Sequence, residues 1–301
     1  MVNIAGITLK SPIVTASGTF GSGQEYAKFN DLSRLGAITV KGVSHEPWQG
    51  NPPPRIAETH GGILNAVGLQ NPGAKAFIKN DLPFLRTIAE KGVKVIVNLC
   101  GRTVEDYVAV ARDFEGVDGI HFFELNISCP NVKAGGMAMG TDPKAAEEVT
   151  RAVKKVASVP LIVKLSPNVT DITAIAKAAE AGGADALCLI NTLLGMKIDI
   201  HKKKPVLGNK IGGLSGPAIK PVAVRMVYQV SKVTSLPIIG TGGASTWEDA
   251  IEFIMAGATA VSVGTANFTN PKATTEMLDG IIDYMQRENI KNLDEIKGII
   301  V

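Results

Sequence analysis

Six polar residues follow short apolar runs along this chain, and their types suit recognition of a ring-shaped ligand. They are Ser17, Lys41, Asn98, Asn126, Lys164 and Asn191. Asparagine offers both a hydrogen-bond acceptor and donors, so the set fits a planar heterocycle with several C=O and N–H groups. No carboxylate or histidine stands at these positions, which argues against metal-assisted hydrolysis or a carboxylate pair. One asparagine alone could be a turn residue, but three at equivalent places favour a binding site.

Glycine-rich runs in the last third of the chain predict a phosphate site. Residues 212–216 read Gly-Gly-Leu-Ser-Gly, residues 240–243 read Gly-Thr-Gly-Gly, and Gly264 precedes Thr265. Without side chains, backbone N–H groups can approach a phosphate, and a following helix N-terminus favours negative charge. We therefore expect a phosphorylated cofactor or substrate, held by the backbone more than by arginine.

Cys129 is the candidate for acid–base chemistry. It lies three residues after Asn126, in the segment that follows an apolar run. An ordinary thiol pKa of about 8.5 suits removal of a proton of modest acidity, if the site stabilises the thiolate. Cys100 and Cys188 are interpreted as small core residues. Residues 132–140 contain three glycines, and they form either a disordered connector or, as we prefer, a lid over the substrate.

The elements that must position these residues alternate between strand and helix. Apolar runs rich in Val and Ile predict eight strands, at residues 13–15, 37–41, 93–99, 119–126, 161–165, 186–190, 237–240 and 260–263. Capping and amphipathic patterns predict helices at residues 142–157, 170–181 and 246–255. Continuously apolar strands between helices indicate a parallel sheet covered on both faces. Eight such units favour a single α/β domain over residues 1–301, a closed (β/α)8 TIM barrel whose strand ends meet at one mouth.

Two long insertions interrupt this alternation, at residues 42–77 and 195–216. Long excursions after strands tend to be functional loops, so we expect both at the mouth. The second contains His201-Lys202-Lys203-Lys204, which is either a solvated loop or a patch for docking or steering. The four histidines fit no ligand spacing, and we assign them no chemistry.

Composition excludes several classes of protein. The 301 residues include 31 Lys+Arg and 28 Asp+Glu, and a net charge of +3 gives no broad basic face for nucleic acid. No run of about 20 apolar residues could span a membrane. Three cysteines without CxxC spacing argue against a disulfide scaffold and against a zinc or iron–sulfur site in this chain, so we expect no metal. The first residues resemble no signal peptide, which predicts a cytoplasmic protein.

Seven segments make the sequence similar to the class 1 dihydroorotate dehydrogenases, which are flavin barrels of pyrimidine synthesis. They span residues 16–21, 39–42, 65–73, 126–131, 163–168, 212–216 and 240–243, and the resemblance covers essentially the whole chain. Segments 65–73 and 126–131 are the most specific. Cys129 points to class 1, because the membrane-linked class 2 enzymes look serine-based. The opening residues look more like the NAD-linked type 1B than the fumarate-linked type 1A.

This resemblance implies FMN at the mouth, with the substrate on its face. The flavin would contact Ser17, Lys41, Gly42, Asn98, Asn126, Lys164, Ile190, Gly216, Gly242, Gly243, Gly264 and Thr265, the last five at its phosphate. Lys164 would stabilise the anionic reduced ring, although it could instead pair with a nearby carboxylate. The substrate would contact Lys41, Asn65, Ala66, Val67, Gly68, Leu69, Asn126, Asn191 and Thr192. A lysine with asparagines suits the carboxylate and ring amides of dihydroorotate.

The resemblance also implies a reaction and partners. Cys129 would take a proton from C5 of dihydroorotate as hydride passes from C6 to flavin N5, giving orotate for UMP synthesis. Electrons would reach NAD through a separate subunit carrying FAD and a 2Fe–2S cluster, in a heterotetramer built on a homodimer of this chain. The alternatives are a fumarate-linked type 1A enzyme, a dihydropyrimidine dehydrogenase-like flavin barrel, a Schiff-base aldolase using Lys164, and a non-catalytic binder of a phosphorylated ligand.

Overall fold

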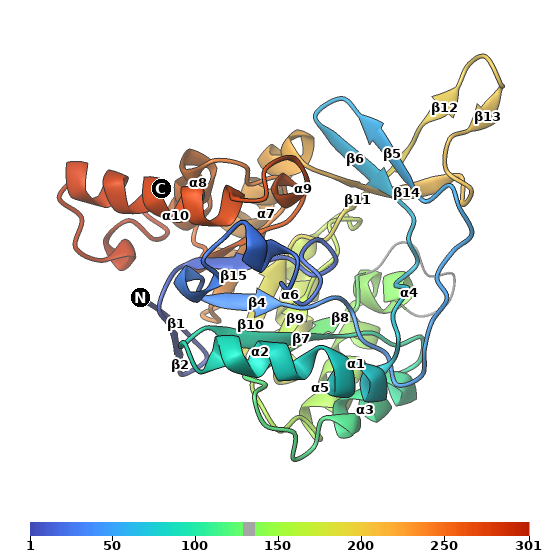
Figure 1. Ribbon diagram of the computed structural model, residues 1–301, viewed down its shortest axis with the longest axis horizontal. Helices are drawn as coiled ribbons and strands as arrows, with labels where there is room; N and C mark the ends of the chain where they lie inside the picture. The colour runs from blue at the N-terminus through green and yellow to red at the C-terminus, as the bar shows by residue number, and fades with distance from the viewer. Residues whose placement is uncertain (129–135, 301) are drawn as a thin grey trace.

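Eight parallel strands close into a barrel in the computed structural model of the chain, which describes residues 1–128 and 136–300 (Figure 1). In chain order they are β3 (Ile13–Thr15), β4 (Ala37–Thr39), β7 (Lys94–Leu99), β8 (Phe122–Asn126), β9 (Leu161–Lys164), β10 (Ala186–Leu189), β15 (Ile238–Thr241) and β16 (Ala260–Val263). Each lies within or overlaps one of the eight predicted runs. The predicted TIM barrel is therefore confirmed. The prediction succeeded because strands that are apolar along their whole length are buried on both faces of the sheet.

Helices surround the barrel between its strands (Figure 1). They are α1 (Ala74–Asn80), α2 (Leu82–Ala89), α3 (Val104–Asp113), α4 (Gly136–Thr141), α5 (Pro143–Lys154), α6 (Ile172–Ala181), α7 (Lys220–Ser231), α8 (Trp247–Met255), α9 (Ala266–Thr269) and α10 (Ala273–Arg287). The three predicted helices correspond to α5, α6 and α8. Asp142 caps α5 by accepting from the Ala145 N–H, and Pro143 follows it at the first helical position. Among the described residues, no helix is long and apolar enough to cross a membrane.

A short N-terminal hairpin closes the end of the barrel opposite the mouth, and sequence analysis did not predict it. It consists of β1 (Val2–Ile4) and β2 (Ile7–Leu9), paired antiparallel. Ile4 and Leu9 are fully buried and pack in one cluster with Ile96, Phe122 and Ile162 of the barrel interior. The lower interior is therefore apolar and sealed, which leaves the opposite end for a site.

The two predicted insertions meet above the mouth in an antiparallel sheet, which we call the cap sheet. Its strands run in the order β11 (Leu193–Met196), β14 (Ile211–Ser215), β6 (Gly62–Asn65) and β5 (Ile56–Thr59). Beyond it, the hairpin of β12 (Ile198–Asp199) and β13 (Lys204–Pro205) projects away from the barrel (Figure 1). Residues 201–204 are all exposed; the first three form the turn of this hairpin and Lys204 begins β13, as expected for a solvated loop.

The cap sheet depends on close backbone packing at Gly62. A Cβ added there would lie 1.9 Å from the backbone oxygen of Ser215, on the neighbouring strand β14. We expect Gly62→Ala to force β6 and β14 apart and to lower the free energy of unfolding by about 1–3 kcal/mol. Thermal and urea unfolding measure this loss.

Glu58→Ala is the matched control, because Glu58 is an exposed residue of β5 in the same sheet. Its unfolding free energy should stay within about 0.5 kcal/mol of the wild type. Equal stability of the Gly62→Ala and Glu58→Ala variants would contradict the packing argument.

Candidate active site

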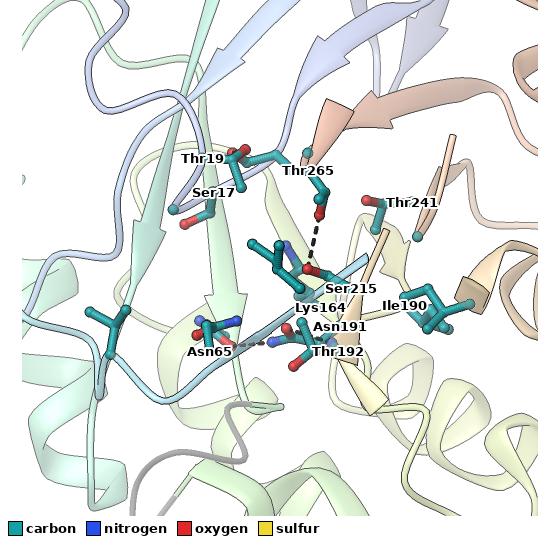
Figure 2. Close-up of a pocket in the computed structure, with 18 of the residues that line it drawn as sticks. Ser17, Thr19, Asn65, Lys164, Ile190, Asn191, Thr192, Ser215, Thr241 and Thr265 are labelled. Atoms are coloured by element: carbon teal, nitrogen blue, oxygen red, sulfur yellow. Dashed lines mark hydrogen bonds between the residues drawn. The ribbon is translucent and has the colours of Figure 1, made fainter. Parts of the chain in front are cut away.

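A cavity that is partly open to solvent lies at the barrel mouth, between the carboxyl ends of the barrel strands and the cap sheet (Figure 2). Its walls include residues that directly follow β3, β10 and β16, which is where ligands bind in TIM barrels. Asn65 and Ile63 of β6 and Ser215 of β14 add a roof from the cap sheet.

Most of the predicted site residues line this cavity. Those that do are Ser17, Lys41, Asn65, Val67, Gly68, Leu69, Asn126, Lys164, Ile190, Asn191, Thr192, Gly242, Gly243, Gly264 and Thr265. They come from segments spread along most of the chain, so the barrel mouth brings together what the sequence separates. Figure 2 shows Asn65, Asn191 and Thr192 near one another on one side, with Lys164 between them and Thr265.

Four predicted residues lie beside the cavity and do not line it. Ala66 is fully buried and donates its N–H to the Arg55 carbonyl. Its side chain packs with Ala57 and Leu64 in a separate apolar cluster, on the opposite side of the segment from Asn65. Asn98 lies beneath Asn126, and Gly42 packs close to Asn98 and Cys100. Gly216 packs against Gly62 of the cap sheet.

The predicted base and part of the predicted lid lie outside the described residues. These are Cys129 and residues 130–135. The rest of the predicted lid, from Gly136 onward, begins the short helix α4. Ser128, the last described residue before Cys129, contacts two residues that line the cavity. Its hydroxyl donates to Asn126 Oδ1 at 3.2 Å and accepts from Asn191 Nδ2 at 2.8 Å.

Several residues that sequence analysis did not single out also line the cavity. Thr241 and Ser215 lie inside predicted glycine-rich runs, so the runs were the signal for them. Thr265 Oγ1 donates to Ser215 Oγ at 2.9 Å, which joins β14 of the cap sheet to the segment after β16 (Figure 2). Ile56 and Phe268 line the cavity yet are about half exposed, and nothing in their local sequence marks them.

Polar and charged side chains fill the barrel interior directly below the cavity. Side chains alternate along a strand, so residues two positions beyond the apolar layer also point inward. Phe122 is therefore followed inside by Glu124, and Ile162 by Lys164. Glu124 and Lys164 are almost completely buried, and Lys164 Nζ lies 3.6 Å from Glu124 Oε1. The predicted alternative of a lysine paired with a carboxylate is thus observed, and Lys164 lines the cavity as well.

Glu124 keeps Lys164 charged. Burial alone would lower the pKa of Lys164, but the nearby Glu124 carboxylate more than compensates, so this pKa lies above its ordinary value. A Schiff-base nucleophile needs a neutral amine, so a lysine held as a cation argues against the aldolase alternative. Burial raises the pKa of Cys188 well above its usual range, as expected for an inert core thiol.

The three predicted asparagines form one hydrogen-bonded chain. Asn98 Nδ2 donates to Glu124 Oε1 at 2.5 Å, and Asn126 Nδ2 donates to Asn98 Oδ1 at 3.3 Å. Asn191 Nδ2 donates to Asn126 Oδ1 at 3.4 Å. Figure 2 shows Asn191 beside Thr192 at the cavity wall. The chain leads from the buried carboxylate to the cavity.

The glycine-rich loop after β15 fits a phosphate group. Gly242 and Gly243 have φ angles of 121° and 86°, which side-chain-bearing residues rarely adopt. A Cβ on Gly243 would lie 2.7 Å from the Gly216 oxygen and 2.8 Å from the Lys220 nitrogen. Backbone atoms therefore come close together around this end of the cavity, as an anion-binding loop requires.

Comparison with known proteins agrees with this geometry. The family profile described as dihydroorotate dehydrogenase matches residues 1–285. The chain belongs to the dihydroorotate dehydrogenase family. The resemblance inferred from its motifs is therefore confirmed. A crystal structure of dihydroorotate dehydrogenase from Eimeria tenella, in complex with ferulenol, has the same fold, with a TM-score of 0.79, 23% identity, and coverage of 99% of this chain and 87% of that one.

Two bacterial relatives carry a more specific name within the dihydroorotate dehydrogenase family. Both are called dihydroorotate dehydrogenase B (NAD(+)), catalytic subunit. The protein from Alkaliphilus metalliredigens is 64% identical and that from Alkaliphilus oremlandii 66% identical, each over 297 residues. These matches cover 99% of this chain and 97% of each relative. The family thus extends over nearly the full length of the chain.

Asp249 fixes the phosphate-type loop and predicts a pH effect on stability. It accepts from the backbone N–H groups of Ser245 and Thr246 and from Lys220 Nζ, at 2.8, 3.0 and 2.7 Å. Partial burial raises the pKa of Asp249, but these partners outweigh it and hold the pKa below its usual value. Asp249 therefore stabilises the fold at neutral pH, and the effect is lost as pH falls through its folded-state pKa.

We expect Asp249→Asn to lower the free energy of unfolding by about 1–2 kcal/mol at pH 7, and its difference from the wild type to shrink below about pH 4. Urea unfolding at several pH values measures both. Asp106→Asn is the matched control, because Asp106 caps α3 through the same two backbone contacts without a lysine partner. The same loss in both variants would show that Lys220 contributes nothing.

Proposed function

We propose that this chain is the FMN-dependent catalytic subunit of an NAD-linked dihydroorotate dehydrogenase, which oxidises dihydroorotate to orotate in pyrimidine synthesis. The observation that carries the proposal is the cavity of the barrel mouth, with a glycine-lined end and a buried cationic lysine in its floor. The names of the two Alkaliphilus relatives support the substrate and the NAD-linked type.

The residues of the cavity suit FMN. Gly242, Gly243, Gly264 and Thr265 would hold its phosphate, with Gly216 supporting the glycine loop from behind. Ser17, Lys41, Asn126, Lys164 and Ile190 would contact the rest of the flavin, while Gly42 and Asn98 would support them from beneath. FMN supplies the acceptor for hydride and passes electrons onward. Lys164 would favour negative charge on the reduced ring, because it is a cation in a site of low dielectric.

The substrate would lie against the roof and the asparagine side of the cavity. Lys41 offers a cation for the carboxylate of dihydroorotate, and Asn65, Asn126, Asn191 and Thr192 offer amide and hydroxyl groups for its ring. Val67, Gly68 and Leu69 would close the site beside the ring, with Ala66 behind them. Uracil-like rings lack the carboxylate, so Lys41 favours dihydroorotate over dihydrouracil.

Cys129 is proposed as the general base that removes the C5 proton of dihydroorotate. The hydrogen bonds of Ser128 to Asn126 and Asn191 support this, because they hold the residue before Cys129 against two residues that line the cavity. The electrons would pass to NAD through a partner subunit with FAD and a 2Fe–2S cluster, in a cytoplasmic heterotetramer. The words "catalytic subunit" in the names of the relatives support such a partner.

The visible spectrum of the purified chain tests the proposed function. The protein should be yellow, and anaerobic dihydroorotate should bleach its flavin absorbance, whereas dihydrouracil should not. A colourless protein that takes up no FMN would contradict the proposal. Reoxidation by fumarate without any partner would favour the type 1A alternative, and a requirement for a partner and NAD would favour type 1B.

Cys129→Ala tests the general base. The variant should retain FMN, yet dihydroorotate should reduce the flavin at least about a hundredfold more slowly, the usual lower range for a general base. Stopped-flow bleaching measures the rate. Thr87→Ala is the control, because Thr87 is an exposed residue of α2 that does not line the cavity. Unchanged reduction in Cys129→Ala would rule out the assignment.

A further inference from the structure

Glu124 is a buried carboxylate that the proposed chemistry does not use. It is 2% exposed, points into the barrel from β8, and lies below the residues that line the cavity. An apolar layer that includes Phe122 and Ile162 lies directly beneath it. A buried carboxylate is costly unless it is paired, and replacing such a pair with apolar residues is often neutral or stabilising. Stability alone therefore gives no reason for a charge here.

Glu124 contacts two residues of the site from below. Its Oε1 lies 3.6 Å from Lys164 Nζ and accepts from Asn98 Nδ2 at 2.5 Å. The strand register explains both contacts. Glu124 is directly opposite Asn98 on β7, and Lys164 comes two residues after the position opposite Glu124 on β9.

The carboxylate also fixes the direction of the asparagine chain. An ionised carboxylate can only accept, so Asn98 must turn its Nδ2 toward Glu124 and its Oδ1 toward Asn126. Asn126 then donates to Asn98, and its own Oδ1 accepts from Ser128 and Asn191. Since that oxygen is already occupied, the group that Asn126 can still offer to a ligand is its second N–H. One carboxylate thus determines which amide atoms face the cavity.

We propose that Glu124 is a positioning residue of this site, which keeps Lys164 charged in the cavity floor and orients Asn98 and Asn126 so that Asn126 offers N–H to the ligand. The inference rests on the proposed function, because FMN is the ligand that these two groups would contact. Glu124 does not line the cavity, so it would act on a ligand through Lys164 and Asn98.

The test compares FMN binding by four full-length proteins after removal and return of the cofactor. Glu124→Gln keeps the shape of the side chain but removes its charge and adds a hydrogen-bond donor. Lys164 then loses its ion-pair partner, and the direction of the hydrogen bonds along the asparagine chain is no longer fixed. Glu124→Asp retains an acceptor-only carboxylate. Asp185→Asn is the matched control, because Asp185 also pairs with a lysine, Lys154 at 2.5 Å, but lies just before β10, away from the mouth. The fluorescence of free FMN reports the dissociation constant.

We expect Glu124→Gln to weaken FMN binding at least tenfold at pH 8. Glu124→Asp should stay within about threefold of the wild type, and Asp185→Asn should bind FMN as the wild type does. Glu124→Gln that binds FMN like the wild type would overturn the inference. If Glu124→Asp bound FMN as weakly as Glu124→Gln, the inference would also be overturned, because retaining the negative charge would then have no effect on FMN binding.

A pH profile separates positioning from a merely structural role. Without the carboxylate, burial favours neutral Lys164, so the ratio of the Glu124→Gln to the wild-type dissociation constant should grow at least about fivefold from pH 6 to pH 9. The other ionisable groups that interact with Lys164 among the described residues are Cys188 and Cys100. Glu124 helps to raise the pKa of Cys188, so the same ratio is also measured in a Cys188→Ala background. A flat ratio would contradict the inference.

The double variant E124Q/K164M guards against loss of the fold. It contains no unpaired buried charge, so it remains testable if Glu124→Gln is unstable. Its FMN binding should be weak but should lack the added pH dependence, and Glu124→Gln should cost less binding in the Lys164→Met background than in the wild type, with the remaining loss due to the asparagine chain. Strictly additive losses would show that Glu124 does not act through Lys164. A wild-type chain that binds no FMN would overturn the proposed function, whereas failure of the Glu124 comparison alone would leave that function standing.

Discussion

The pairing of one buried carboxylate with one buried cation is the interaction on which the rest of the site depends. Barrel strands send every second side chain inward, so charges on β8 and β9 cannot reach water and must satisfy each other. Glu124 and Lys164 do so at 3.6 Å, directly above an apolar layer. Along β8 and β9, the barrel interior therefore changes from an apolar layer to the charged floor of the cavity within two residues.

The barrel could be predicted from the sequence because each of its strands is a local signal. A run such as residues 93–99 is mostly apolar, as expected for a parallel strand that is covered on both faces. The cap sheet gives no such signal. Its strand β6 is paired with β14, and the contact from Asn65 to Gly213 spans 148 residues. The hairpin of β1 and β2 was not predicted because each of its short strands has one buried residue and no continuous apolar run, unlike the equally short β3 and β4.

The site could be predicted where chemistry follows position along a strand. Asn126, Lys164 and Asn191 all stand at or beyond strand ends, and all line the cavity. Ala66 shows the limit of that reasoning, since it belongs to a matching segment but its side chain points away from the neighbouring Asn65. Glu124 shows another limit, because a lone carboxylate in a buried strand is recognised as functional only when its partners on two other strands are known.

The split origin of the cap sheet has a consequence for how the site is assembled. The buried ion pair of the floor belongs to the neighbouring strands β8 and β9. The roof needs two insertions from opposite halves of the chain, and the barrel closes only when β16 pairs with β3. Neither half of the chain can therefore form the cavity alone, so ligand binding reports that both halves have folded together.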